Sequence, residues 1–201
     1  MNLLRAFIAI EIPSPIQQAI EKNTARLRSA LDSNLVRWTP TSNIHLTLKF
    51  LGDVSPTTIE MLTQLLTVEA SQYTCFEMQF GGLGTFPSPR RPRVIWIGIQ
   101  APAALEALQH GIEAATARMG YPTENRPFSP HLTIGRVKQT TGPADAQKIR
   151  VALEGTNIGA LGNGKVEAVH LFKSDLKPTG SVYTRLFSAP LKNYEVTPER
   201  T

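Results

Sequence analysis

The sequence contains one short pattern twice, as His45-Leu46-Thr47-Leu48 and as His131-Leu132-Thr133-Ile134. Polar and apolar residues alternate in both copies, which predicts two strands with one polar face and one buried face. Each strand would place its histidine and threonine on the polar face and its two aliphatic residues in the core. The chain has only 4 histidines, so the repetition is a specific feature. It indicates an internal duplication, with two similar lobes facing each other across a cleft.

The segments around the two patterns predict a mixed α+β chain with hairpin-compatible connections. Runs of β-branched and aromatic residues indicate strands, and aliphatic residues at near-helical spacing indicate helices. The expected strands cover residues 7–10, 36–38, 44–51, 75–86, 94–99, 131–137, 165–172 and 182–188. The expected helices cover residues 16–31, 55–72, 105–120 and 144–153, and Pro87 to Arg93 is expected to form a loop.

Length and composition limit the class of protein. The chain has 201 residues, 41% hydrophobic and 18% charged, and predicts a single domain over residues 1–201 with a polar tail from about residue 192. A net charge of +5 favours anionic partners such as nucleotides or RNA. The single cysteine, Cys75, has no internal disulfide partner, and no apolar run is long enough to span a membrane. We therefore expect a cytoplasmic monomer that makes no membrane contact.

Two imidazoles and two hydroxyls in one pocket would suit displacement at phosphorus. Imidazole can hold either protonation state near neutral pH, so one histidine could act as the base and the other as the acid. Thr47 and Thr133 could donate hydrogen bonds to the phosphate oxygens. Neither pattern contains Asp or Glu, and we expect no metal and no cofactor. The alternative is that His45 and His131 are ordinary packed residues, although a repeated polar face inside apolar strands is costly.

Three segments make the sequence similar to a known family: Arg5–Ile10, His45–Gly52 and Pro130–Arg136. In their order and spacing they resemble the two-histidine (2H) phosphoesterases, and among these the RNA 2′,3′-cyclic phosphodiesterases, also described as 2′-5′ RNA ligases. Looser matches are Phe86-Pro87, Arg93–Trp96, and Lys173–Leu176 with Gly180 and Tyr183.

The resemblance implies a bilobal, pseudo-twofold fold, in which two antiparallel-sheet lobes flank a central cleft and the helices lie outside. It implies metal-independent hydrolysis of RNA 2′,3′-cyclic phosphate ends to 2′-phosphomonoesters, with reversible 2′-5′ RNA ligation as a side reaction. By the family pattern His45 is the proton donor to the leaving 3′ oxygen, and His131 is the proton acceptor that activates water. The residues by themselves do not assign these two roles.

Arg136 and the basic segment from Arg90 to Arg93 are candidate contacts for the RNA backbone. A guanidinium suits phosphate, but strict alternation puts Arg136 on the face opposite to His131. A phosphate contact therefore requires a bulge or a bend near Gly135. The segment Arg90–Arg93 has three cations and no acid, so it is either a rim for RNA or a solvated loop.

Two aromatic residues and two further cations complete the candidates. Phe7 and Phe128 could stack on a terminal base, with packing in the core as the alternative. Lys49 shares the strand parity of His45, which favours either a site cation or an edge cation. His170 lies in an apolar strand pattern that favours a buried structural histidine.

Two other functions remain open at this point. A non-catalytic RNA-end binding module would hold the phosphate in the same cleft without turnover. A related 2H phosphodiesterase could also act on a small nucleotide, such as a cyclic phosphate of ADP-ribose or a 2′-5′ oligonucleotide.

Overall fold

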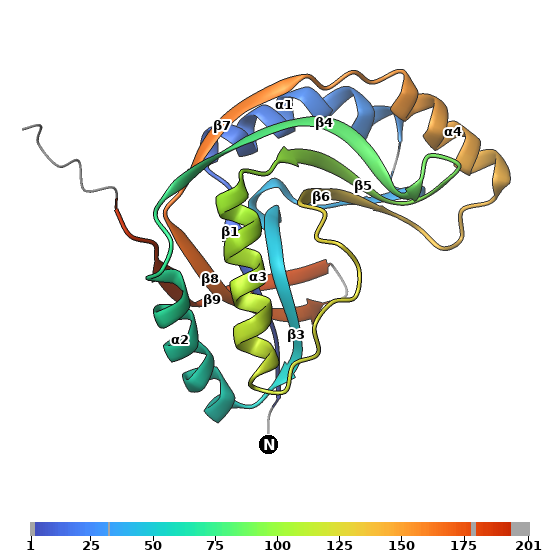
Figure 1. Cartoon of the computed structure of the whole chain (residues 1–201). Helices are drawn as coiled ribbons and strands as arrows, with labels where there is room; N and C mark the ends of the chain where they lie inside the picture. Colours follow the sequence, from blue (N-terminus) through green and yellow to red (C-terminus); the bar gives the residue numbers. More distant parts are fainter. Residues whose placement is uncertain (1–2, 32, 178–179, 194–201) are drawn as a thin grey trace, which may run out of the picture.

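The computed structural model describes residues 3–31, 33–177 and 180–193. Within this part of the chain the strands form two antiparallel sheets, with helices on their outer sides (Figure 1). The first sheet has the order β3-β1-β8-β9, with β1 at Leu4–Glu11, β3 at His45–Val54, β8 at Ala168–Lys177 and β9 at Gly180–Pro190. The second has the order β2-β6-β5-β4-β7, with β2 at Val36–Trp38, β4 at Phe76–Ser88, β5 at Arg91–Gln100, β6 at His131–Val137 and β7 at Ala160–Val166.

The two sheets repeat one arrangement of strands. The order β3-β1-β8-β9 corresponds to β6-β5-β4-β7, and β2 is added beside β6. Each histidine pattern opens its strand, β3 in the first sheet and β6 in the second, and these two strands contact each other. The predicted bilobal α+β fold is therefore confirmed, with the two patterns at the meeting of the lobes.

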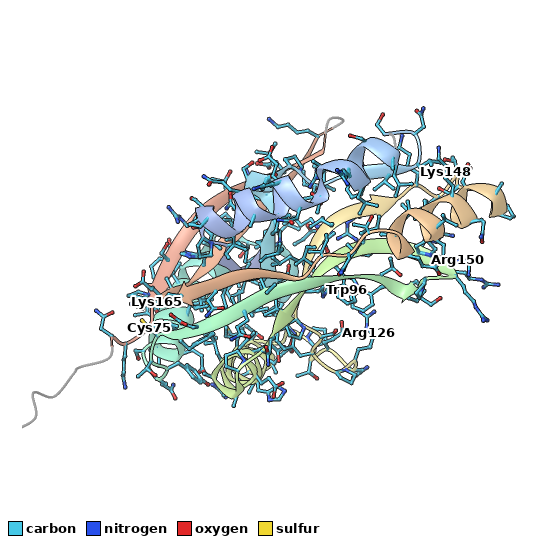
Figure 2. All side chains as sticks on the ribbon, turned by 90° about the horizontal axis from the view of Figure 1, so that it is seen from above. Cys75, Trp96, Arg126, Lys148, Arg150 and Lys165 are labelled. Carbon is cyan, nitrogen blue, oxygen red and sulfur yellow. The ribbon has the colours of Figure 1, made fainter. Side chains whose placement is uncertain are left out.

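Each sheet has a pair of helices on its outer face. Helices α2 (Pro56–Ala70) and α3 (Ala103–Ala117) pack on the first sheet. Helices α1 (Ser14–Ala30) and α4 (Pro143–Glu154) pack on the second sheet, and Figure 2 shows them above its strands, with Lys148 and Arg150 marking α4. A short 3₁₀ turn, η1 at Thr41–Asn43, leads into β3. The chain thus leaves the first sheet after β1 to cover the second sheet, and returns to the first sheet for β3.

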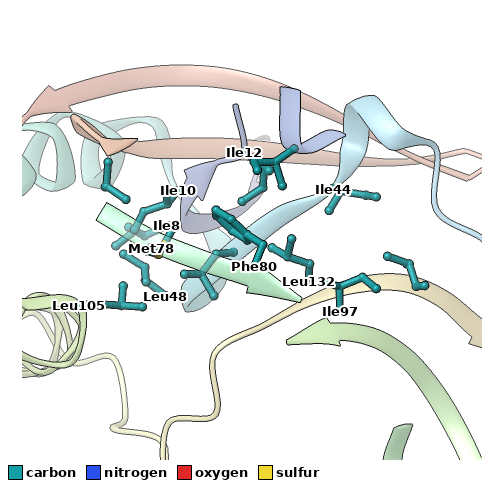
Figure 3. Packing of buried hydrophobic residues seen from close by; sticks show 14 of the residues in the cluster. Ile8, Ile10, Ile12, Ile44, Leu48, Met78, Phe80, Ile97, Leu105 and Leu132 are labelled. Atoms are coloured by element: carbon teal, nitrogen blue, oxygen red, sulfur yellow. The ribbon is translucent and has the colours of Figure 1, made fainter. Parts of the chain in front are cut away.

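A continuous hydrophobic core joins both sheets. Ile8 and Leu48 of the first sheet belong to the same cluster of buried residues as Phe80, Ile97 and Leu132 of the second (Figure 3). The aliphatic residues of both patterns are buried, as the alternation predicts. The polar faces of β3 and β6 are consequently left on the sides of the sheets that the helices do not cover.

Two expectations about the strands were wrong. The segment from Pro87 to Arg93 is no loop, because β4 continues to Ser88 and β5 begins at Arg91, with a turn between them. The strand expected over residues 165–172 is in fact the end of β7 and the start of β8, divided at Glu167. Of the predicted polar tail, Lys192 and Asn193 are described, and residues 194–201 lie outside the described residues.

Strand β7 was not expected because its sequence contains two glycines. It pairs with β4 at the edge of the second sheet. A β-carbon on Gly164 would lie 3.0 Å from the ring of Phe80 and 3.0 Å from Pro13. The strand therefore approaches its neighbours too closely for a larger residue, and packing outweighs the low strand propensity of glycine.

No helix in the described part of the chain is long and apolar enough to span a membrane.

We expect Gly164→Ala to lower the free energy of unfolding by about 1–2 kcal/mol, because the added methyl group must displace a buried ring. Denaturant unfolding would measure the change. The matched control is Gly159→Ala, since nothing among the described atoms lies within 4 Å of a β-carbon at that position. Equal stability of the two variants would contradict the packing explanation for β7.

Candidate active site

Both histidines are held in the same way at the first residue of their strands. The Nδ1 atom of His45 lies 2.8 Å from the backbone oxygen of Asn43, and Nδ1 of His131 lies 2.7 Å from that of Ser129. A carbonyl oxygen can only accept, so each Nδ1 carries the hydrogen and donates it. The Nε2 atom of each ring is therefore the nitrogen left for chemistry.

Each histidine strand has a β-bulge directly after its threonine. In β3 the pairing with β1 moves from Ala9↔Thr47 to Ile8↔Lys49, so that Leu48 is the extra residue. In β6 the pairing with β5 skips Ile134 in the same way. The two residues after each threonine are both buried, which reverses the alternation from that point on.

The bulge at Ile134 brings Arg136 to the face that His131 and Thr133 occupy. A bulge near Gly135 was required for Arg136 to contact a phosphate bound beside His131, and the structure contains one. The pKa of His45 is lowered mainly by burial, an effect that the hydrogen bond to Asn43 opposes and the positive charge of Arg136 reinforces. Arg136 of the second lobe is therefore near His45 of the first, in agreement with the contact between β3 and β6.

The bulge at Leu48 turns Lys49 away from the site. Its side chain is only 5% exposed, and its Nζ donates to the carboxylate of Glu113 at 2.6 Å and to the carbonyl of Pro122 at 2.6 Å. The expectation that Lys49 is a site or edge cation was wrong, because it rested on uninterrupted alternation. The ion pair with Glu113 instead connects β3 to α3, and the hydrogen bond to Pro122 connects β3 to the loop that precedes His131.

Phe50 takes the place on the site face that alternation would give to Lys49. It follows two buried residues in β3, its side chain is 66% exposed, and its ring centroid lies 6.1 Å from that of Phe7. The sequence analysis missed this residue. The signal was available, since the bulge considered for Arg136 also applies to the first copy of the pattern.

Of the two candidates for base stacking, Phe7 is packed and Phe128 is half-buried. Phe7 is 3% exposed, and its ring centroid lies 4.8 Å from that of His45 and 5.3 Å from that of Phe172. Phe7 thus supports the His45 ring and leaves no free face for a base. Phe128 is half-buried and packs against the main core.

Aromatic rings flank both imidazoles. Tyr183 meets the ring of His45 edge-on at 5.0 Å, and Phe86 meets the ring of His131 edge-on at 4.9 Å. Trp96 in turn packs on Phe86 at 5.3 Å. These contacts restrict the tilt of each imidazole and remove water from one side of it, and burial by such neighbours is what lowers the pKa of His45.

The remaining candidates are three arginines of the second sheet and one histidine of the first. Arg90 and Arg91 are exposed at the turn between β4 and β5, and Arg93 is exposed on β5. His170 is 8% exposed, as predicted for a buried histidine, and it lines a cavity beside His45. Among the described residues, His, Cys, Asp and Glu form no group of three or more that could hold a metal ion.

Comparison with known proteins assigns the family. Residues 12–177 match the model of the 2′-5′ RNA ligase superfamily. The chain belongs to this superfamily. An RNA 2′,3′-cyclic phosphodiesterase of Methanothermobacter thermautotrophicus is 33% identical over 181 residues, which are 90% of this chain and 95% of that protein.

Two solved structures have a similar fold. The protein TT0787 of Thermus thermophilus superposes with a TM-score of 0.78 at 26% identity, covering 95% of this chain and all of the other. E. coli LigT complexed with 3′-AMP superposes with a TM-score of 0.72 at 27% identity, covering 95% of this chain and 99% of the other. The resemblance described from the sequence motifs is therefore confirmed.

We expect Arg136→Gln to raise the pKa of His45, because removal of a neighbouring cation favours the protonated imidazole. The pKa should stay below its ordinary value in the variant, since burial is the larger cause. An NMR titration of the imidazole resonances would measure it. The control Arg126→Gln removes an 84% exposed cation that pairs with Glu124 and should leave the His45 titration unchanged. An identical His45 pKa in wild type and Arg136→Gln would show that the two lobes do not share one site.

Proposed function

We propose that this protein hydrolyses 2′,3′-cyclic phosphate ends of RNA to 2′-phosphomonoesters, with His45 as proton donor and His131 as proton acceptor. The observation that carries the proposal is the matched anchoring of the two imidazoles, which leaves both Nε2 atoms for chemistry in a site that also includes Arg136. The names of the superfamily relatives support the same reaction.

The proposed reaction is an in-line displacement at phosphorus. His131 accepts a proton at Nε2 from a water molecule as the water oxygen bonds to phosphorus. The bond between phosphorus and the 3′ oxygen breaks, and His45 gives its Nε2 proton to that oxygen. The product carries a 2′-phosphate and a 3′-hydroxyl, and the two histidines have exchanged protonation states. The same sequence, with a 5′-hydroxyl in place of water, is 2′-5′ ligation, and its reverse cleaves a 2′-5′ linkage.

Thr47, Thr133 and Arg136 would bind the phosphate in this scheme. The two threonines share the face of their histidines, and Arg136 reaches the same face through the bulge at Ile134. Hydroxyl and guanidinium donors placed there would stabilise the charge that develops on the non-bridging oxygens. No step of the scheme is assigned to a metal or a cofactor.

Phe50 would stack on the base of the terminal nucleotide, replacing the earlier candidates Phe7 and Phe128. It is an exposed aromatic ring on the site face, and base stacking on such a ring tolerates any base. This fits an enzyme that reads the chemistry of an RNA end more than its sequence.

The organisation of the whole chain is part of the proposal. One core shared by both sheets supports a single domain, and one half-buried cysteine supports a reducing compartment such as the cytoplasm. We propose that the protein acts there as a monomer on RNA ends.

We expect His45→Ala and His131→Ala each to lower kcat by about 10²- to 10⁴-fold, the usual effect of removing a positioned proton-transfer group. The assay uses a short RNA with a 2′,3′-cyclic phosphate end in excess EDTA, followed by mapping of the product phosphate. Binding of the same RNA should change much less.

Wild-type turnover in either variant would contradict the two-histidine assignment. Binding of the RNA without any turnover by the wild type would favour the non-catalytic binding module. Loss of turnover in EDTA with recovery on addition of a divalent ion would overturn the metal-free scheme.

We expect Phe50→Ala to lower kcat/KM for 2′,3′-cyclic AMP by about tenfold or more, mainly through KM, because base stacking on an aromatic ring contributes roughly 1–3 kcal/mol. Phe50→Tyr should retain most of the activity. The control Val151→Ala shortens an exposed apolar side chain on α4 and should leave the kinetics unchanged. Unchanged kinetics in Phe50→Ala would exclude the stacking role.

A further inference from the structure

A cavity extends from His45 across the site face of the first sheet. It has a volume of about 690 Å³, and its walls come from the end of β1, the start of α1, η1 with the start of β3, the β7–β8 junction, β8 and β9. Ligand sites in proteins have volumes of roughly 300–1,000 Å³, so the cavity is large enough for a nucleotide. His45 forms part of its wall, so a group in the cavity would lie beside the imidazole that the proposed reaction uses.

The cavity and Phe50 lie on different sides of His45, because residues 42–45 line the cavity and Phe50 follows later in β3. Phe50 belongs to β3, which is one edge of the first sheet. The cavity continues from His45 over β1 and β8 to Arg185 on β9, the opposite edge, and Phe50 is not part of its wall. If the terminal base stacks on Phe50, the rest of an RNA chain has the cavity as its path away from the site.

A cluster of charged and polar side chains lies in this cavity. Nη1 of Arg185 donates to the carboxylate of Glu11 at 2.9 Å. The same carboxylate oxygen lies 3.9 Å from Nε2 of His170, whose Nδ1 lies 2.9 Å from the hydroxyl of Ser188. Arg185 and Glu11 are each about half exposed, with 51% and 47% of their side-chain surfaces accessible.

The chemistry of this cluster matches a nucleotide. A guanidinium has five N–H donors, and the ion pair that the structure describes for Arg185 uses Nη1, so further donors can bind a phosphodiester. The carboxylate of Glu11 holds the guanidinium at the wall and can itself accept from a ribose hydroxyl or a base amino group. A wall with both donors and acceptors suits a nucleotide better than an isolated anion or an apolar ligand.

We propose that this cavity binds the second nucleotide of the RNA, counted from the cyclic phosphate end, and that Arg185 contacts the phosphodiester that joins it to the terminal nucleotide. This subsite rests on the proposed function, and it makes an oligonucleotide end a better substrate than a free cyclic mononucleotide. His170 and Glu11 are positioning residues, which act by orienting Arg185 and shaping the wall.

The test compares two substrates that differ by one nucleotide: ApA with a terminal 2′,3′-cyclic phosphate, and 2′,3′-cyclic AMP. We expect wild-type kcat/KM to be higher for the dinucleotide. Arg185→Gln should lower kcat/KM for the dinucleotide by about tenfold, the usual effect of losing a charge-assisted hydrogen bond, and leave that for the mononucleotide within about twofold. Arg185→Lys should keep part of the preference.

The control Lys148→Gln removes one positive charge from the exposed side of α4 on the other sheet (Figure 2) and should change neither substrate. Equal wild-type kcat/KM for both substrates would overturn the subsite. An equal fall for both substrates in Arg185→Gln would also overturn it, because Arg185 would then act at the catalytic centre or on the fold.

Failure of the proposed function gives a different result from failure of the subsite. If neither substrate is hydrolysed, the proposed function is wrong. The cavity can then be tested by calorimetry, which compares the affinity for ApA with a 2′-phosphate end with the affinity for 2′-AMP. Tighter binding of the dinucleotide that Arg185→Gln abolishes supports the subsite, and equal binding by wild type and variant overturns it.

Discussion

One extra residue in each histidine strand determines which side chains the site contains. Leu48 and Ile134 interrupt the pairing of β3 and β6 directly after the threonines. Without these bulges, Lys49 and Gly135 would face the site and the residues after them would be buried. The proposed phosphate and base contacts therefore depend on a backbone irregularity that both lobes share.

The two lobes use the same backbone for different tasks. After the bulge, the first lobe buries Lys49 against Glu113 and exposes Phe50, whereas the second buries Gly135 and exposes Arg136. A β-carbon on Gly135 would lie 2.8 Å from the ring of Trp38, so the second lobe has no room there for a longer side chain. Duplication thus supplies two equivalent histidines. The packing on the buried side of each strand determines which further side chain faces the site, Phe50 in β3 and Arg136 in β6.

The sequence predicted the parts of the site that follow strand alternation and missed the parts that depend on tertiary packing. His45, His131 and the two threonines lie before the bulges, where alternation holds, and they lie where it placed them. Phe50 lies beyond a bulge that alternation alone does not mark, and its place follows only if the bulge considered for Arg136 is carried over to the first copy of the pattern. The contact of Arg185 with Glu11 joins strands at opposite ends of the chain, so spacing in the sequence carries no signal for it.

The crossing of the chain between the sheets makes the two halves of the polypeptide mutually dependent. A cut in the loop between α3 and β6 would leave β1 and β3 without β8 and β9, and it would leave β2 without β6, its neighbour in the second sheet. Neither fragment would hold a complete sheet, yet together they would contain every strand. Folding of either lobe therefore requires both halves of the polypeptide, even though the lobes resemble independent repeats.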